Sequence, residues 1–135
     1  MKSFILACLV AIVSIAPNAQ AFDDARELKI IMQEMGQIFK TLGKSVAQGS
    51  VSAVELASAR QLVKLAEESA TVLPDLSRFP NRELATARYL ELNSKLLIAM
   101  KDAEAAISRA DAAGALKALE QAKLLRTQGH DEFML

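Results

Sequence analysis

The fold of this chain is set by the segment Leu28-Lys-Ile-Ile-Met-Gln-Glu-Met-Gly-Gln-Ile-Phe-Lys-Thr-Leu-Gly-Lys-Ser-Val46. Its apolar residues recur at spacings of three and four, which places them on one face of an α-helix. We expect this helix to run from Asp24 to Ala47, because an aspartate side chain can cap its first turn and Gly49 permits a left-handed cap after its end. The segment therefore predicts a long amphipathic helix.

Three further helices are expected at residues 52–72, 81–110 and 115–133, with a turn at 111–114. Ser52 and Glu55 have the spacing of a capping box, Asn81 can cap the third helix, and Pro74 ends the second. Short turns join the helices, so consecutive helices should be antiparallel neighbours. The sequence thus predicts an all-α fold, an antiparallel up-down-up-down four-helix bundle. The residues expected on the inner faces of the last two helices are Leu84, Leu92, Leu96, Ala99, Ala103, Ala106, Leu116, Leu119 and Ala122.

Residues 1–21 have the pattern of a secretory signal peptide. A basic residue is followed by an apolar run, and an Ala-Gln-Ala cleavage site ends at Ala21. The apolar run is too short to span a membrane as a helix. We therefore expect export to the periplasm and a mature domain of residues 22–135 that does not insert into the membrane. Attachment as a lipoprotein through Cys8 is disfavoured, because this cysteine comes before the apolar run has ended.

The composition excludes several classes of function. Of the 16 basic and 16 acidic residues, loss of Lys2 with the signal peptide leaves 15 and 16, and the single cysteine is lost as well. A near-neutral charge without a basic patch argues against nucleic-acid binding. A chain without cysteine has no disulfide, no thiolate metal site and no cysteine nucleophile.

The only histidine, His130, lies near the end of the last expected helix, four residues after Arg126. The inner face of this helix is expected to continue through Arg126, His130 and Phe133, so that it becomes polar in its last two turns. In an up-down bundle the start of the first helix lies beside the end of the fourth. We therefore expect Met32 and His130 at the same end of the bundle, on inward faces.

A histidine and a methionine are the axial ligand pair of many haem irons, and a soft thioether disfavours magnesium or calcium. Copper would usually recruit more ligands, and only Met35 is near. Each residue also has an ordinary explanation. Met32 can fill the core, His130 can be exposed at a helix end, and Arg126 can extend along the surface. The residue pattern alone favours these ordinary explanations.

Two segments, however, resemble the cytochrome b562 and cytochrome c′ group of periplasmic four-helix haem proteins. In residues 28–40, Met32 falls where cytochrome b562 has its axial methionine, and Met35-Gly36 is similar to a pair common in cytochromes c′. In residues 118–133, His130 falls where the group has its proximal haem ligand.

This chain departs from the cytochromes c′ at the point of haem attachment. Those proteins bind haem covalently through C-x-x-C-H, but Arg126 and Gly129 stand at the two cysteine positions here. Arg126 instead matches the arginine four residues before the histidine of cytochrome b562. Met134 is a second departure, because many relatives have a basic residue there.

The resemblance implies one non-covalent haem b (iron protoporphyrin IX) with His130 as proximal and Met32 as distal ligand of its iron. Arg126 would lie at the haem edge, where its charge offsets a propionate. The function implied is electron transfer with a soluble or membrane-bound redox partner, without enzymatic turnover. The residues expected to form the apolar wall of the haem site are Leu28, Met35, Phe39 and Phe133.

Two alternatives remain open at this point. In the first, Met32 only covers an open coordination position, and the protein binds small gases such as nitric oxide. In the second, the chain is a haem-free periplasmic helical bundle that acts as an interaction protein. Proteins of the cytochrome c′ type are often dimers, so the resemblance also allows a homodimer.

Overall fold

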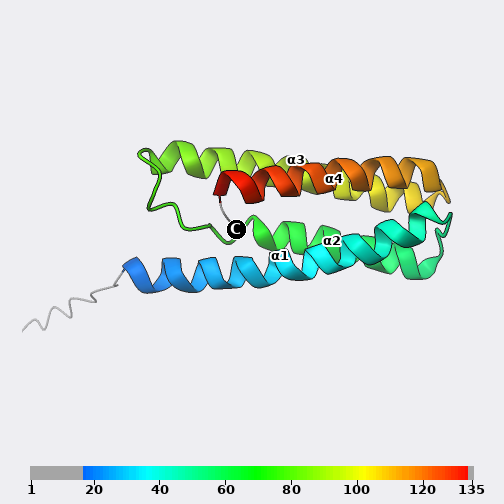
Figure 1. Ribbon diagram of the computed structural model, residues 1–135, viewed down its shortest axis with the longest axis horizontal. Coiled ribbons are helices and arrows are strands. Elements are labelled where there is room, and N and C mark those ends of the chain that lie inside the picture. The colour runs from blue at the N-terminus through cyan, green and yellow to red at the C-terminus, as the bar shows by residue number, and fades with distance from the viewer. Residues whose placement is uncertain (1–16, 134–135) are drawn as a thin grey trace, which may run out of the picture.

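The computed structural model describes residues 17–133, which form four helices. These are α1 (Pro17–Ala47), α2 (Ala53–Ser69), α3 (Arg82–Ser108) and α4 (Ala112–Phe133). They run alternately in opposite directions along the long axis of the molecule (Figure 1). The contacting pairs are α1–α2, α2–α3, α3–α4 and α4–α1, so the helices close into a ring. The predicted all-α four-helix bundle is confirmed.

The first helix begins earlier than predicted, at Pro17 rather than Asp24. The expected signal peptide falls mostly on residues 1–16, which lie outside the described residues. Within residues 17–133, no helix combines the length and the apolar character that crossing a membrane requires.

The predicted capping residues act at the starts of α2 and α3. Ser52 and Glu55 form the capping box, in which the Ser52 backbone N–H donates to Glu55 Oε2 at 2.9 Å. Asn81 Oδ1 accepts from the backbone N–H of Leu84 at 3.0 Å. Each bond satisfies an amide that has no partner inside its own helix.

Three helix boundaries differ from the prediction. α2 ends at Ser69 rather than residue 72, because side chains donate hydrogen bonds to its last carbonyl groups. Tyr89 Oη donates to Ser69 O at 2.6 Å, and Thr71 Oγ1 donates to Glu68 O at 2.7 Å. α3 ends at Ser108, and Ala110 has a positive φ of 56°. α4 begins at Ala112 rather than residue 115, because Asp111 Oδ1 accepts from the Gly114 backbone N–H at 2.9 Å.

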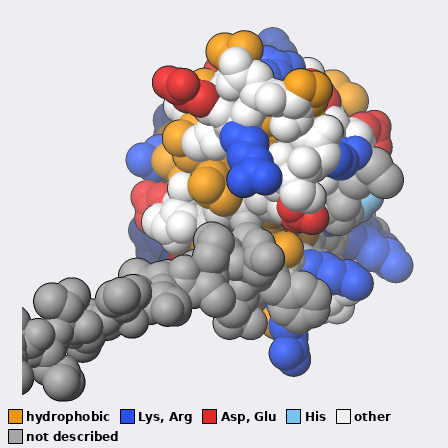
Figure 2. Space-filling model, turned by 90° about the vertical axis from the view of Figure 1, so that its left-hand side faces the viewer, with side chains coloured by type: hydrophobic (Ala, Val, Ile, Leu, Met, Phe, Trp, Pro, Cys, Tyr) orange, Lys and Arg blue, Asp and Glu red, His pale blue; other side chains and the backbone are white. Residues whose placement is uncertain are grey.

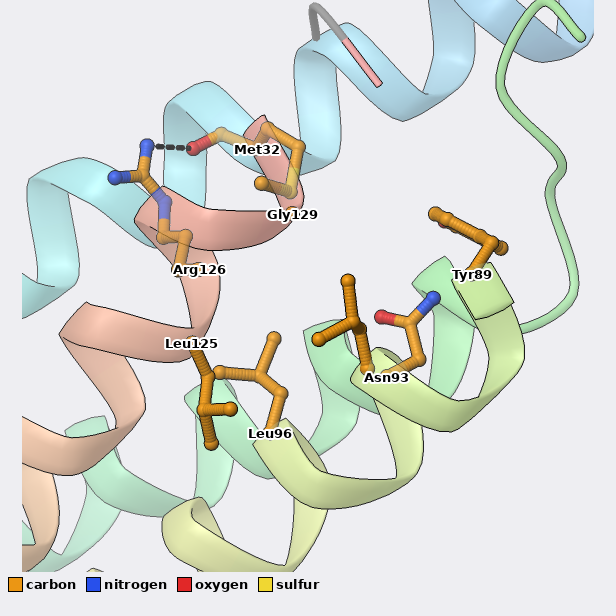
Figure 3. Close-up of a pocket in the computed structure, with 8 residues that line it drawn as sticks. Met32, Tyr89, Asn93, Leu96, Leu125, Arg126 and Gly129 are labelled. Carbon is orange, nitrogen blue, oxygen red and sulfur yellow. Dashed lines mark hydrogen bonds between the residues drawn. The ribbon is translucent and has the colours of Figure 1, made fainter. Parts of the chain in front are cut away.

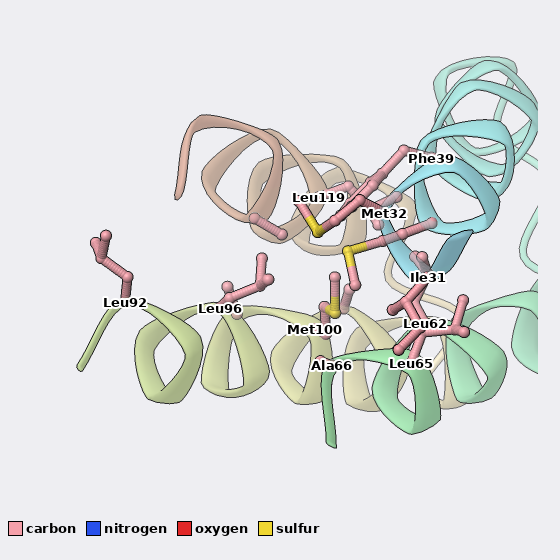
Figure 4. Packing of buried hydrophobic residues seen from close by; sticks show 14 of the residues in the cluster. Ile31, Met32, Phe39, Leu62, Leu65, Ala66, Leu92, Leu96, Met100 and Leu119 are labelled. Atoms are coloured by element: carbon pink, nitrogen blue, oxygen red, sulfur yellow. The ribbon is translucent and has the colours of Figure 1, made fainter. Parts of the chain in front are cut away.

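The core is one continuous cluster of buried apolar side chains from all four helices (Figure 4). On α3 the predicted inner residues are buried except Leu84, which is 67% exposed. Leu84 was predicted wrongly because the inner line of α3 passes through its neighbour Ala85 and on to Tyr89. The buried residues of α3 and α4 include six alanines, which are Ala85, Ala99, Ala103, Ala106, Ala115 and Ala122.

These alanines make the bundle asymmetric. Small side chains let helix backbones approach closely, and α3–α4 is the most extensive helix contact in the molecule. The contact between α1 and α4 is the least extensive. The contact of α4 with α3 is therefore much more extensive than its contact with α1.

The end of α4 is fastened to α3 and to the loop before it. Phe133 is buried, and its ring centroid lies 5.4 Å from those of Phe79 and Tyr89. The Glu132 carboxylate accepts two bonds from Arg88, at 3.0 Å from Nε and 2.9 Å from Nη2. The last turn of α4 thus takes its position from α3 rather than from α1.

Replacement of Glu132 by Gln should lower the free energy of unfolding at pH 7 by up to about 1 kcal/mol, because the paired side chains are about a third exposed and water screens them. Hydrogen bonds from Arg88 hold the pKa of Glu132 below its ordinary value of 4.5. The stabilisation is therefore complete above the ordinary pKa and is lost as the pH falls through the lowered one. Urea unfolding of both proteins between pH 7 and pH 3 measures this. A difference that persists at pH 3 contradicts an ionic role for Glu132.

Candidate functional site

Arg126 reaches from α4 across to α1. Its Nη2 donates a hydrogen bond to the backbone carbonyl oxygen of Met32 at 3.0 Å (Figure 3). Gly36 makes this approach possible, because a Cβ atom at that position would lie only 2.8 Å from Arg126 Nη2. The two segments that carry the cytochrome resemblance therefore meet at this contact.

The Arg126 guanidinium is half-buried without a counter-ion in the described part of the chain. Its Nε is shielded from solvent and has no hydrogen-bond partner among these residues. Burial lowers the pKa of Arg126, because removal from water disfavours the charged form. A buried cation without an anion is costly to the folded state. Arg126 is therefore a place where an anionic group would be stabilised.

A second unsatisfied donor belongs to Asn93 on α3. This side chain is 7% exposed, and its Oδ1 accepts from Ser69 Oγ at 3.0 Å. Its Nδ2 makes no well-formed hydrogen bond within residues 24–133, but it faces the Tyr89 hydroxyl and acts to lower the pKa of that group. One turn earlier, burial raises the pKa of Tyr89 to about 12, so the phenol stays a neutral donor to Ser69 O. A buried amide hydrogen without an acceptor is uncommon in folded proteins.

Arg126 and Asn93 line one pocket, at the end of the bundle where α4 finishes (Figure 3). Its volume is about 20 Å³, which is about the space of one water molecule. The Asn93 amide nitrogen points toward Tyr89, and the Arg126 guanidinium points toward the Met32 carbonyl (Figure 3). The lining residues are Met32 from α1, Tyr89, Leu92, Asn93 and Leu96 from α3, and Leu125, Arg126 and Gly129 from α4. Positions 126 and 129, where cytochromes c′ have their two cysteines, thus form one wall of the pocket that contains Met32.

His130 does not lie in this pocket. Its side chain is exposed, so the predicted inward orientation is wrong for this structure. The burial of Phe133 gives the reason, because Gly129 and Phe133 are four residues apart and share one line along α4. Because the line through Gly129 and Phe133 faces the interior, the neighbouring His130 lies on the outer surface of α4. Figure 2 views this end of the bundle, where hydrophobic and basic side chains are interleaved on the surface.

A groove with a volume of about 480 Å³ lies between α1 and α4, and the position of His130 can be described relative to it. We call it the α1–α4 groove, and its lining residues are Gly36, Phe39, Lys40, Gly43, Lys44, Leu116, Leu119, Glu120, Lys123 and Arg126. Residues seven apart lie within about 20° of each other around a helix and about 10 Å apart along it. Met32 is seven residues before Phe39, and His130 is seven after Lys123. The two predicted ligands therefore flank the continuation of this groove toward the end of the bundle.

The remaining predicted site residues are all buried. Leu28 and Met35 are fully enclosed in the core, and Phe39 lies both in the core and in the α1–α4 groove. Phe133 contacts the aromatic rings of α3 and its preceding loop. Met134 lies outside the described residues. The structure thus brings Met32, Arg126 and Phe39 to one region, whereas Phe133 lies on the side toward α3.

The sequence prediction did not identify Asn93, which lines the pocket, or the role of Gly36, which contacts Arg126. Asn93 follows Tyr89 at a helical spacing of four within an otherwise apolar inner face, and that interruption was the signal for it. Gly36 stood in the sequence as part of the Met35-Gly36 pair, but its contact with Arg126 depends on how α1 and α4 cross. Only the assembled fold supplies that information.

Within residues 17–133, no cluster of three or more His, Cys, Asp or Glu side chains could hold a metal ion. A site built from one methionine and one histidine suits a cofactor that brings its other metal ligands with it, as haem does. No known protein family, curated protein or solved structure matches this chain. The resemblance to the cytochromes therefore rests on the two sequence segments alone.

Two glycines of α1 form a matched pair for testing the Arg126 contact. Alanine at Gly43, where a Cβ meets nothing within 4 Å, should raise the free energy of unfolding by roughly 0.5–1 kcal/mol through helix propensity. Alanine at Gly36 gains the same propensity but displaces the Arg126 guanidinium from the Met32 carbonyl, so it should be about 1 kcal/mol less stable than the Gly43 variant. Urea unfolding measures both. Equal stabilities would contradict the Arg126 contact.

Proposed function

We propose that this protein is a periplasmic b-type cytochrome that binds one haem without a covalent bond and transfers electrons. The observation that carries the proposal is the pair of buried, unsatisfied donors at one pocket, Arg126 Nε and Asn93 Nδ2, beside the Met32 side chain. Met32 and Arg126 are also the residues that the cytochrome resemblance assigns to the haem site.

Met32 and His130 would hold the iron from its two sides. Met32 is 8% exposed, which suits a thioether ligand kept away from water. His130 would have to turn its imidazole from the surface toward α1. His130 lies on the flank of α4 that carries Lys123, a lining residue of the α1–α4 groove. The α1–α4 contact is the least extensive helix contact of the bundle.

Arg126 and Asn93 would bind the anionic edge of the cofactor. A guanidinium next to a propionate carboxylate makes a charge-assisted hydrogen bond, which would satisfy the unpaired Nε. Asn93 Nδ2 can donate to the same group or to a water held beside it. The cofactor would thus relieve the two unsatisfied donors of the pocket.

The apolar residues around Met32 would exclude water from the iron. Leu28, Met35 and Phe39 are buried on the same face of α1 as Met32. Bound haem supplies a one-electron couple, and an apolar surround together with methionine ligation raises its reduction potential. None of these residues is placed to act on a substrate, and we propose no enzymatic activity.

One observation favours a second function, which is that of a haem-free periplasmic interaction protein. The pocket beside Met32 has a volume of only about 20 Å³, and His130 is exposed. Haem uptake therefore requires α1 and α4 to separate at this end of the bundle. A bundle that does not open in this way would keep the fold without the cofactor.

An absorption spectrum of the purified protein with one equivalent of haemin distinguishes these functions. We expect sharp low-spin bands after reduction with dithionite. His130→Ala should abolish specific uptake, and Met32→Leu should retain haem but become high-spin, because the sixth ligand is lost. Met100→Leu is the matched control, since this methionine of α3 is also buried but lies outside the predicted haem site and should leave the spectrum unchanged.

The other outcomes each favour an alternative. A low-spin spectrum that Met32→Leu leaves unchanged would falsify the ligand assignment. A high-spin reduced protein that binds carbon monoxide rapidly would point to an open site for small gases. No specific uptake of haemin would leave the helical interaction protein.

A further inference from the structure

The α1–α4 groove has an apolar floor. Phe39 is buried at its base, and Leu116 and Leu119 line it from α4. On the α1 side, Gly36 and Gly43 have no side chains to fill the groove. A Cβ placed at Gly43 would meet nothing within 4 Å. The groove therefore has open space beside apolar side chains midway along two helices.

The rim of the groove is positively charged. Lys40 and Lys44 from α1 and Lys123 from α4 are exposed, and Arg126 closes one end. Glu120 is the single acidic lining residue, so the lining carries four positive charges and one negative, a net +3. Within the described part of the chain, none of the three lysines forms an ion pair, whereas Lys64, Lys95 and Lys101 elsewhere do. The groove thus presents uncompensated positive charge above an apolar floor.

We propose that the α1–α4 groove binds a monomeric fatty acid, with its acyl chain on Phe39, Leu116 and Leu119 and its carboxylate at Lys40 and Lys123. Gly36 and Lys44 are eight residues apart, so the α1 wall is about 12 Å long, which suits an extended medium-length chain. The groove volume of about 480 Å³ lies within the range of small-molecule pockets. This site requires neither haem nor His130.

The lining chemistry favours this ligand over other anions. A nucleotide phosphate is usually held by the backbone amides of a helix N-terminus, but the groove lies along the middle of α1 and α4. A peptide needs partners for its backbone amides, and Glu120 is the only acidic acceptor among the lining side chains. An acyl carboxylate needs an apolar floor and a cation, and the groove offers both.

Isothermal titration of the purified protein with sodium dodecanoate, below its micellar concentration, tests the proposal. We expect saturable binding of one molecule per chain. Dodecyltrimethylammonium, which has the same chain and the opposite charge, should bind at least tenfold more weakly. Equal binding of both would overturn the assignment of the lysines. Binding only to phosphatidylglycerol vesicles, and not to dodecanoate, would show a membrane-surface site and overturn the free fatty acid.

Two variants and one control locate the ligand. Gly43→Leu should reduce dodecanoate affinity at least tenfold, because the new side chain fills open space in the groove without a clash. Lys123→Glu should weaken it about tenfold, which corresponds to about 1.4 kcal/mol. Lys117→Glu is the control, since Lys117 is exposed on α4 but does not line the groove. Unchanged affinity in a folded Gly43→Leu protein overturns the proposal.

Failure of this proposal can be told apart from failure of the haem proposal. Gly43 and Lys123 belong to neither the pocket beside Met32 nor the predicted ligand pair. If both proposals hold, Gly43→Leu loses dodecanoate but still takes up haemin. A protein that binds dodecanoate and ignores haemin retains the groove and refutes only the cytochrome.

Discussion

The half-buried guanidinium of Arg126 is the constraint on which this end of the bundle depends. It crosses from α4 to α1 and donates to the Met32 carbonyl oxygen, and the glycine at position 36 leaves room for the guanidinium. In the described residues it has no carboxylate beside it, and one of its nitrogens is buried without an acceptor. A fold that carries this unfavourable element gains from an anionic group that satisfies it.

The distribution of alanine determines where such a group can enter. Buried alanines allow α3 and α4 to pack closely. The Arg88–Glu132 pair and the Phe133 ring hold the last turn of α4 against α3. The α1–α4 contact is therefore the one that can open at least cost. The pocket beside Met32 and the α1–α4 groove both border Arg126, so ligands at the two places would share one cation.

The helices and their capping residues could be predicted from the sequence because they depend on local spacing, as at Ser52 and Asn81. The meeting of Met32 with Arg126 was also predictable, since up-down topology places the two chain ends together. The orientation of His130 was not, because burial of Phe133 fixes the rotation of α4 and moves the histidine outward. Asn93 and Gly36 acquire their roles only through contacts between helices that sequence spacing does not specify.

The central claim is that Met32 lies against a haem iron. The most direct measurement is a carbon–proton NMR spectrum of the reduced protein with haem, after labelling of the methionine ε-methyl groups. The account predicts that the Met32 methyl signal moves far upfield through the haem ring current, whereas the Met100 signal moves little. A spectrum in which no methionine methyl moves, or in which the displaced signal belongs to Met35, would contradict it.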